Sequence, residues 1–313
     1  MVEKHYDGKI LKQYFKSAEA YLEKQIDELN ALNVFPVPDG DTGINMFLTL
    51  QAATAAVDNL HTSSASEITA KAARGALIGA RGNSGVILSQ ILRGIAKGME
   101  MKERFSAFDF AEAIHCASET AYKAIAKPVE GTILTVIREA SVAAMHQAKR
   151  GANLKQTIAA MASNAYETVK QTPELLPVLK EAGVVDAGGK GLWYVFLAMN
   201  DVTSQETAGR RSAGGAGQAS EAGYGFALQF LIEGDDMPVD EIREKLNGMG
   251  TSLQVVGDEQ LLRVLVHTHD TQAILDYAAT HGTLRDVNIE QQDEQVKRFK
   301  ASSTLKLDNT EQS

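Results

Sequence analysis

The chain has 313 residues and a formal net charge of −9, with 44% hydrophobic residues and one cysteine, Cys116. This hydrophobic content is sufficient for a packed core, and the acidic balance argues against a general nucleic-acid-binding protein, which usually carries a basic face. A single cysteine excludes a disulfide framework within the chain and favours a reducing, cytoplasmic setting. The charged N-terminal stretch is unlike a signal peptide. No apolar run reaches the roughly 20 residues that span a bilayer.

The first part of the chain is predicted to be mainly α-helical. Apolar residues recur at spacings of three, four and seven over residues 9–31, as on one stripe of an amphipathic helix. No segment before about residue 200 shows convincing strand alternation. These patterns assign residues 1–203 to a helical domain. Further helices are predicted over residues 44–57, 66–80, 86–97, 107–126, 131–148, 154–170 and 190–200.

A change of composition marks the predicted domain boundary. Residues 204–222 are small, polar and glycine-rich, which is typical of a flexible linker. Residues 223–300 follow the order β-α-β-β-α-β, which predicts a small α+β domain of ferredoxin-like type, and its sheet edge could pair in a homodimer. The tail, 301–313, is polar and is predicted to be disordered. The strands are predicted over 226–234, 252–258, 261–268 and 283–290, and the helices over 239–249 and 270–282.

The stretch NVFPVPDGDTGINM (33–46) places two carboxylates, Asp39 and Asp41, between two predicted helices. Pro36 and Pro38 discourage a helix there, and in extended backbone residues two apart point roughly the same way. Neighbouring carboxylates repel, so one tends to protonate unless a cation lies between them. Hard oxygen ligands suit Mg²⁺ or Ca²⁺, although the EF-hand pattern fails here. The alternative is a stiff turn whose aspartates cap the following helix.

A second glycine-rich stretch, GARGNSG (79–85), precedes a predicted helix. Its glycines allow backbone amides to approach a ligand closely, and Asn83 and Ser84 are favourable helix N-caps. A helix N-terminus preceded by glycines is a natural phosphate site, where Arg81 would add positive charge. The alternative is an ordinary turn between helices. The chain contains neither a Walker A sequence nor a GxGxxG after a strand, so P-loop and Rossmann folds are not predicted.

Two further clusters, PVEGT (128–132) and DAGGKG (186–191), also precede predicted helices. Each could be a simple helix-start turn. Several loops of this type in one helical domain nevertheless suggest a ring of helix ends facing one ligand. A metal-binding carboxylate pair together with a phosphate-binding helix start indicates a Mg²⁺–nucleotide complex.

In the same order, NVFPVPDGDTGINM, GARGNSGVILSQILRG, PVEGTILTVIREA and GVVDAGGKG closely resemble the nucleotide-binding domain of bacterial fatty acid kinase. That domain is related to the L subunit of dihydroxyacetone kinase. The resemblance covers residues 1 to about 200, and residues 223 to about 295 resemble the family's middle domain more loosely. It implies an antiparallel barrel of about eight helices that binds ATP and two Mg²⁺ ions at one end. It further implies transfer of the γ-phosphate to a fatty acid carboxylate presented by a separate carrier protein, which gives an acyl phosphate.

The resemblance also implies roles for individual residues. Asp39 and Asp41 match the family's metal ligands. Asn33 lies near a position where the dihydroxyacetone kinase branch has a further ligand aspartate, and it is assigned with them to the metal and nucleotide site. No residue is an obvious covalent nucleophile, and phosphoryl transfer needs positioning and charge neutralisation more than covalent chemistry. The implied phosphate contacts are Thr42, Asn45, Gly82, Asn83 and Ser84, the residues near the nucleotide are Gly131, Thr132 and Asp186, and Arg81 joins the two aspartates as a catalytic residue.

The chain departs from the family's pattern in two places. The middle domain usually carries a cysteine and two histidines that hold zinc, but here Gly225 and Leu265 replace the cysteine and the first histidine. His267 and His269 remain, and two residues cannot form a closed tetrahedral zinc site, so no zinc is predicted and the histidines are assigned a structural role. The family's long C-terminal domain, associated with carrier docking, is absent from these 313 residues.

Two alternatives to a fatty acid kinase subunit stay open. The first is a kinase of the dihydroxyacetone type, acting on a small triose. The PVPDGDTG form and the fused second domain disfavour it. The second is a non-catalytic regulatory protein that binds a nucleotide. Intact Asp39, Asp41, Asn83 and Ser84 argue against an inactive site, because paired carboxylates without a cation only repel.

Overall fold

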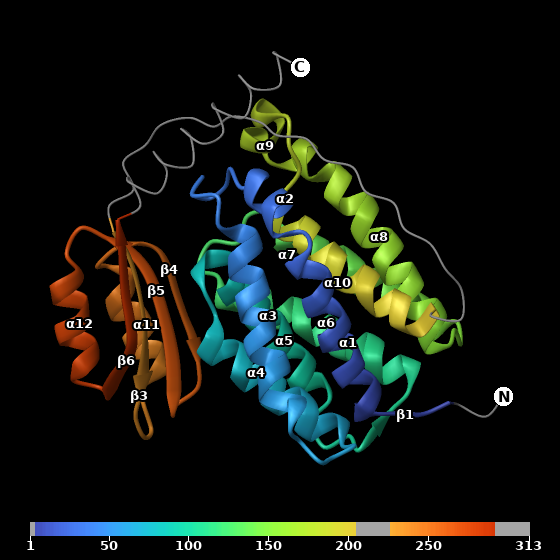
Figure 1. The fold of residues 1–313 in the computed structure, drawn as a ribbon. Helices are drawn as coiled ribbons and strands as arrows, with labels where there is room; N and C mark the ends of the chain where they lie inside the picture. The colour runs from blue at the N-terminus through green and yellow to red at the C-terminus, as the bar shows by residue number, and fades with distance from the viewer. Residues whose placement is uncertain (1–3, 205–225, 292–313) are drawn as a thin grey trace.

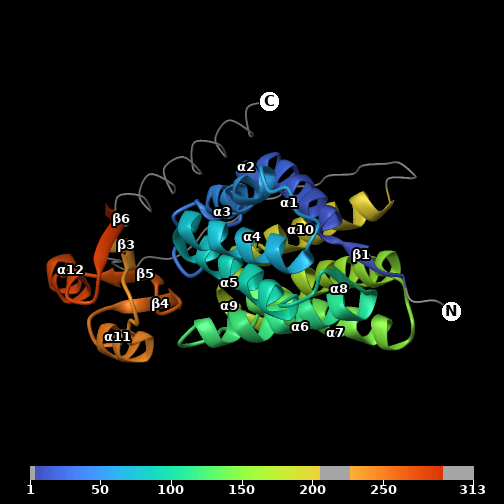
Figure 2. The ribbon, with the colours of Figure 1, turned by 90° about the horizontal axis from the view of Figure 1, so that it is seen from below.

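The computed structural model describes residues 4–204 and 226–291. Figure 1 shows a helical part and, beside it, a smaller part built of one sheet and two helices, and Figure 2 shows the same arrangement from below. The predicted tail, and the predicted linker apart from its first residue, lie outside the described residues. The exact domain boundaries therefore stay a prediction.

The helical part buries one continuous apolar core. Leu22, Leu50, Ile91 and Ile137 are among its members and are at most 1% exposed. Its helices are α1 (Gly8–Glu23), α2 (Ile26–Ala31), α3 (Thr42–Asp58), α4 (Ala65–Gly79), α5 (Gly82–Gly98), α6 (Ala107–Ala124), α7 (Ile133–Lys149), α8 (Leu154–Leu175), α9 (Pro177–Ala182) and α10 (Ala187–Ser204).

The single helix predicted over residues 9–31 is wrong, because the chain turns between α1 and α2. The N–H of Gln25 donates to the carbonyl of Leu22, three residues back, which is a turn rather than an α-helical bond. The turn has a consequence for packing. It places Asn30 at the end of α2, where its side-chain oxygen accepts bonds from the N–H groups of Gly43 (2.7 Å) and Ile44 (3.3 Å) at the start of α3.

Other boundaries also differ from the sequence prediction. The prediction omits the short helix α9, although proline in the first turn and Gly183 after the last are ordinary helix start and stop signals. α8 continues past the predicted end at residue 170 and includes Pro173 in its last turns. Two two-residue strands, β1 (Tyr6–Asp7) and β2 (Arg104–Phe105), pair antiparallel where the sequence pattern predicts no strand. They are too short for a period-two pattern to be detected.

The smaller part follows the predicted β-α-β-β-α-β order. Its sheet has the strand order β4-β5-β3-β6, with antiparallel neighbours throughout. Asp270 caps α12 through the N–H of Ala273, in agreement with its position before the predicted helix. The elements are β3 (Phe226–Glu233), α11 (Val239–Asn247), β4 (Thr251–Gly257), β5 (Leu261–Thr268), α12 (Thr271–Ala279) and β6 (Thr283–Gln291).

The two faces of this sheet have different neighbours, because side chains alternate along each strand. Leu228, Phe230 and Val264 point to one face and share a core with apolar residues of α11 and α12. The opposite face packs against the helical part near the junction of α4 and α5 (Figure 1). That interface is an apolar cluster of Leu77, Ala80, Val86, Leu231, Val256, Leu261 and Leu265.

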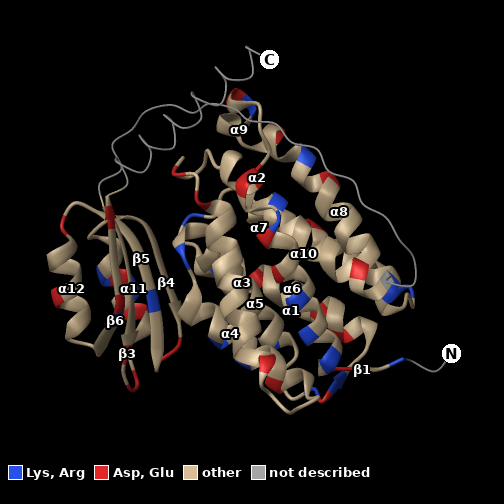
Figure 3. Cartoon of the chain, viewed as in Figure 1, with Lys and Arg blue, Asp and Glu red and all other residues tan. Residues whose placement is uncertain are grey.

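Charged residues are dispersed over both parts. Figure 3 shows Lys and Arg interspersed with Asp and Glu in this view, rather than gathered on one face. Within residues 4–204 and 226–291, every helix is too short or too polar to cross a bilayer.

Candidate functional site

The carboxylate pair lies in the non-helical segment between α2 and α3. Asn33 is buried, and its side-chain nitrogen donates to Oδ1 of Asp39 at 2.6 Å and to Oδ1 of Asp41 at 3.5 Å. The amide therefore holds the two carboxyl groups together from one side. In this arrangement its nitrogen, rather than its oxygen, faces the pair.

The two carboxyl groups influence one another electrostatically. Burial, followed by the negative charge of Asp41, raises the pKa of Asp39 well above its ordinary value. Burial also raises the pKa of Asp41. Raised pKa values mean that the ionised form of each carboxyl group is disfavoured in these surroundings. A bound divalent cation would remove this penalty.

Helix capping does not account for these aspartates. Asp41 occupies the N-cap position of α3, but its side chain makes no capping hydrogen bond. Asn30 of α2 accepts from the first N–H groups of α3 instead. The alternative in which the aspartates serve as caps is therefore wrong for Asp41.

The start of α5 lies across from the pair. The helix begins at Gly82, so Asn83 and Ser84 belong to its first turn, and their predicted role as N-caps is wrong. Gly82 has φ +53°, and a Cβ there would overlap the side-chain amide of the buried Asn45. Only glycine allows this approach between α3 and α5. Ser84 Oγ lies 3.3 Å from Oγ1 of Thr42, which links the first turns of both helices.

The cap of α5 comes from the small domain. Gln229 on β3 donates through Nε2 to the carbonyl of Ala80 at 2.7 Å, and its Oε1 accepts from the N–H of Gly82 at 3.1 Å. Gln254 on β4 donates through Nε2 to Oδ1 of Asn83 at 2.6 Å. Side chains more than 140 positions away in the sequence thus hold the loop, as the separations of 147, 149 and 171 residues show.

Arg81 also turns toward the small domain. Its guanidinium lies 3.4 Å from Oδ2 of Asp286 on β6. The same carboxylate lies 3.2 Å from the guanidinium of the fully buried Arg263 on β5. Arg81 is half-exposed and lines a cavity beside the carboxylate pair, so its charge lies at the edge of the site.

This cavity, of about 460 Å³, lies between the carboxylate pair, the start of α5 and the sheet of the small domain. A second cavity of about 420 Å³ adjoins it and shares Phe35, Pro36, Asn83 and Ser84 as walls. The first contains the carboxylate pair. The second combines apolar side chains from α5, α7 and the segment before α7 with polar ones such as Thr132 and Asp186, and residues 247–254 of the small domain form another of its walls. The first is lined by Asn33, Asp39, Asp41, Thr42, Asn45, Arg81, Gly82, Gln229, His267, Asn288 and Glu290, among others.

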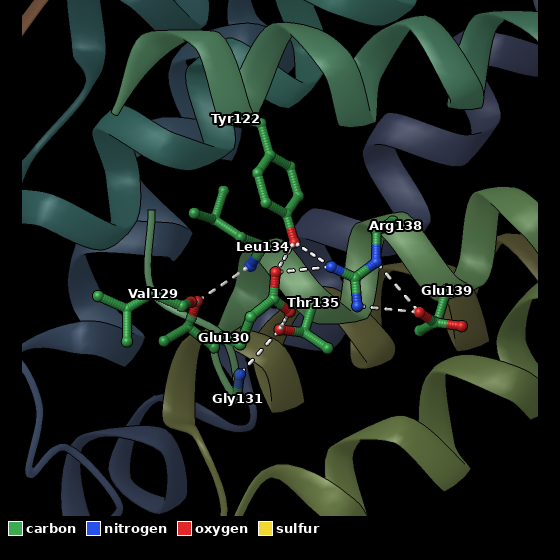
Figure 4. Close-up of polar contacts among 9 residues, drawn as sticks. Tyr122, Val129, Glu130, Gly131, Leu134, Thr135, Arg138 and Glu139 are labelled. Atoms are coloured by element: carbon green, nitrogen blue, oxygen red, sulfur yellow. Dashed lines mark hydrogen bonds and ion pairs between the residues drawn. The ribbon is translucent and has the colours of Figure 1, made fainter. Parts of the chain in front are cut away.

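The loop before α7 forms one wall of the second cavity and is held by the polar network in Figure 4. Glu130 accepts hydrogen bonds from Tyr122 (3.0 Å), Thr135 (2.7 Å) and Arg138 (2.6 Å). Burial raises the pKa of Glu130, but these hydrogen bonds outweigh it and the net shift is downward. The network fixes the loop in which Gly131 has φ +81°.

Thr132 and Asp186 cap the two helices that converge on the second cavity. Thr132 accepts from the N–H of Leu134 at 3.3 Å as the N-cap of α7, which begins at Ile133 rather than at the predicted residue 131. Asp186 accepts from the N–H of Gly189 at 2.7 Å, so α10 begins at Ala187, earlier than predicted. Burial raises the pKa of Asp186 to about 7, although the N–H groups of Gly189 and Ile133 act to lower it.

The structure therefore gathers the predicted site residues around two adjoining cavities, except Gly131, which is in neither lining but lies in the loop beside the second cavity. Sequence reasoning missed the contribution of the small domain, namely Gln229, Gln254, His267, Asn288 and Glu290. The sequence assigns His267 a structural role, yet it is buried and lines the cavity of the carboxylate pair, and burial lowers its pKa. The strand alternation along β5 could have indicated this position of His267, because it places His267 on the same sheet face as Leu265.

These features define a two-domain protein whose helical domain carries a carboxylate pair opposite a glycine-rich helix start, with a small sheet domain covering both. Residues 36–201 match the family described as "DAK2 domain", and this match spans just over half of the chain. The chain belongs to the DAK2 domain family. Residues 223–299 match the family of middle domains that occur in proteins like fatty acid kinase. The resemblance to the fatty acid kinase nucleotide-binding domain is thus confirmed.

Curated relatives and a solved structure are similar to this chain. "Protein YloV" of Bacillus subtilis is 37% identical over 325 residues, covering 97% of this chain and 58% of that protein. An uncharacterised protein of Staphylococcus saprophyticus is 38% identical over 307 residues, covering 92% of this chain and 56% of that protein. The chain thus spans little more than half the length of these relatives. The dihydroxyacetone kinase from C. freundii, solved with AMP-PNP and Mg²⁺, matches with a TM-score of 0.48 and 18% identity, covering 62% of this chain and 34% of that one.

Proposed function

We propose that the protein is an ATP- and Mg²⁺-dependent kinase subunit that transfers the γ-phosphate to an acceptor presented by a partner protein. The acceptor we favour is a fatty acid carboxylate held by a carrier protein. One observation carries the proposal: the paired carboxyl groups of Asp39 and Asp41 and the first turn of α5 line one cavity, which adjoins a second one lined by both apolar and polar side chains.

The residues present fit a Mg²⁺–nucleotide complex. The pKa values of Asp39 and Asp41 are raised, so their ionised forms are disfavoured, and a bound cation would stabilise those forms. Among the described residues there is no group of three or more His, Cys, Asp or Glu that would hold a metal ion by itself. Mg²⁺ commonly takes one or two carboxylates and completes its shell with phosphate oxygens and water. When bound, Mg²⁺ would neutralise charge on the polyphosphate; we expect two ions.

The chain's own groups bind and orient the nucleotide in this proposal. Asp39 and Asp41 hold the metal, and Asn33 aligns them through its amide. Arg81 supplies positive charge at the edge of the cavity. Residues proposed to contact phosphates are Thr42, Asn45, Gly82, Asn83 and Ser84. Those proposed to lie near the rest of the nucleotide are Thr132 and Asp186, which line the second cavity, and Gly131, which lies in the loop beside it.

A carboxylate acceptor suits this set of residues. A carboxylate oxygen forms the new bond to the γ-phosphorus while the bond from that phosphorus to the bridging oxygen breaks, and ADP leaves. A carboxylate has no proton to lose at neutral pH, so the step needs no general base. Positioning and charge neutralisation are the main requirements of phosphoryl transfer.

A second candidate is a kinase of the dihydroxyacetone type, acting on a hydroxyl group. One observation favours it: His267 is buried, has a lowered pKa and lines the cavity of the carboxylate pair. A neutral imidazole is a suitable base for removing a hydroxyl proton. A non-catalytic nucleotide-binding role is the third possibility.

The first test is calorimetric titration with ATP, with and without Mg²⁺, followed by phosphate-transfer assays. The proposal expects binding that requires Mg²⁺. Transfer to a fatty acid in the presence of a carrier protein supports the favoured acceptor, and transfer to dihydroxyacetone supports the second candidate. Mg²⁺-dependent binding without transfer to either acceptor supports the regulatory role. Absence of ATP binding under every metal condition contradicts all three.

Several finer expectations remain predictions. These are the barrel description of the helical domain, the ferredoxin-like description of the small domain, a homodimer through the sheet edge, the absence of zinc and a cytoplasmic location. β6 is the edge strand of the sheet beside β3, and it is the element at which such a pairing would be tested.

A further inference from the structure

The sheet face that meets the helical domain contains buried polar side chains among its apolar ones. Gln229 and Gln254 are each 6% exposed, and Arg263 is fully buried. They alternate with the apolar residues that form the interface, such as Leu231 and Val256. Burying polar groups at a domain interface costs free energy unless hydrogen bonds compensate it.

All three side chains reach the segment that leads into α5. Gln229 bridges the backbone of Ala80 and Gly82. The guanidinium of Arg263 donates to the carbonyl of Leu77 at 2.8 Å and to that of the following residue. These two residues contact backbone groups, so they fix the path of the loop.

Gln254 differs, because it contacts a side chain of the proposed phosphate site. Its Nε2 donates to Oδ1 of Asn83 at 2.6 Å. Its own Oε1 is buried and has no hydrogen-bond partner in the part of the chain that the structure describes. Burying an amide oxygen without a partner costs free energy, and an apolar side chain of the same size would pack there without that cost. Domain packing alone therefore does not explain a glutamine at this position.

The contact holds the Asn83 amide with Oδ1 toward Gln254. Because Oδ1 accepts from Gln254, Nδ2 is the part of the amide that remains as a donor for a ligand. Asn83 lines both cavities, and an N–H donor suits a phosphate oxygen. In the orientation that the structure shows, this bond to the small domain leaves the Nδ2 group of Asn83 available to donate to an anion.

We propose that Gln254 is a positioning residue, through which the small domain orients Asn83 to donate to a nucleotide phosphate. This inference rests on the proposed function of the site. The small domain then contributes to nucleotide binding through the orientation of Asn83, and Gln254 itself lines the second cavity.

The test is a double-mutant cycle on the affinity for ATP in the presence of Mg²⁺, measured by calorimetry on the full chain. Gln254→Met keeps the volume and removes the hydrogen bond, and Asn83→Ala removes the group being oriented. We expect Gln254→Met to weaken binding about tenfold, the order of the loss found when the partner that orients a ligand-binding group is removed. The double variant should bind no more weakly than Asn83→Ala alone, because the two residues act through one contact.

Leu261→Met is the matched control. It places the same side chain in the same interface, away from both cavities, and we expect its affinity to stay within about twofold of wild type. Gln254→Asn keeps an amide at this position but is too short to reach Asn83, so it should weaken ATP binding as much as Gln254→Met does. Agreement between the two variants would show that the loss comes from the missing hydrogen bond and not from a folding defect in Gln254→Met.

The outcomes separate this inference from the proposed function. If the wild type binds ATP with Mg²⁺ but Gln254→Met binds equally well, the positioning role is wrong. If the effects of Gln254→Met and Asn83→Ala multiply, Gln254 acts on stability and not through Asn83, which also overturns it. If the wild type does not bind ATP at all, the proposed function fails and the inference fails with it.

Discussion

Two loops face the same cavity, and they are held in different ways. The carboxylate loop is organised within the helical domain, where Asn30 caps α3 and Asn33 aligns Asp39 and Asp41. The loop before α5 is held from outside its domain, by Gln229 and other side chains of the sheet. The first loop therefore depends on local sequence, and the second depends on docking of the small domain.

The two loops also have different proposed roles in the site. The carboxylate loop supplies the metal ligands, and its geometry should survive changes in the small domain. The loop before α5 supplies groups for the phosphates, and its geometry should be sensitive to such changes. Variants in each loop and at the helix starts around the cavities test this division.

Removal of the metal ligands should have the largest effect. Asp39→Ala/Asp41→Ala should weaken Mg²⁺-dependent ATP binding by at least about 1000-fold, since losing a single partner of a metal ligand already costs about 10- to 100-fold. Calorimetry with and without Mg²⁺ measures this. Asp27→Ala changes an aspartate on the neighbouring helix α2 that lies outside the cavity lining, and it should bind as the wild type does. Equal binding by the double variant would show that the pair does not hold the metal.

The buried Asp186 should make stability depend on pH. Its pKa of about 7 in the folded state exceeds the unfolded value, so its contribution to stability is complete below about pH 4 and is lost as the pH rises through about 7. Asp186→Asn keeps the acceptor for the N–H of Gly189 but has no carboxyl group to ionise. Its free energy of unfolding should therefore not show the fall on the order of 4 kcal/mol that the wild type shows as the pH rises. Urea unfolding across this range measures the difference between the two proteins, and parallel curves would contradict the prediction.

Gln229 should matter more for stability than an ordinary polar residue. Gln229→Leu leaves the N–H of Gly82 and the carbonyl of Ala80 unpaired in a buried interface, which should lower the free energy of unfolding by about 2 kcal/mol. Gln260→Leu, at an exposed position of the same domain, is the control. A change below about 0.5 kcal/mol for Gln229→Leu would show that the loop does not depend on the sheet.

Asn33 offers the smallest and most specific test. Asn33→Asp places a third carboxylate against the pair, so we expect tighter Mg²⁺ binding by about tenfold, because carboxylate count tunes metal affinity. Without metal the added repulsion should lower the melting temperature. Asn33→Ala, which removes the amide without adding charge, separates the two effects. An unchanged dependence on Mg²⁺ concentration would place the metal away from Asn33.

The difference between locally held and remotely held features also explains what could be predicted from the sequence. The carboxylate pair, most of the helices and the strand order of the small domain follow local patterns of period and turn residues. The cap of α5 could not be predicted, because it comes from Gln229, 147 positions beyond Gly82. Similarly, the break between α1 and α2 brings Asn30 to the start of α3, a contact that no local pattern indicates. Local sequence patterns cannot indicate contacts between residues that are far apart in the chain.

The most direct test of a shared metal–nucleotide site is to locate the metal. Mn²⁺ can replace Mg²⁺ in the presence of a non-hydrolysable ATP analogue, and its paramagnetism broadens amide NMR signals nearby. We predict the strongest broadening at residues 39–45 and 82–84, with clear broadening at Gln229 and His267 and little at α12. Strong broadening elsewhere, with sharp signals at residues 39–45, would contradict the account.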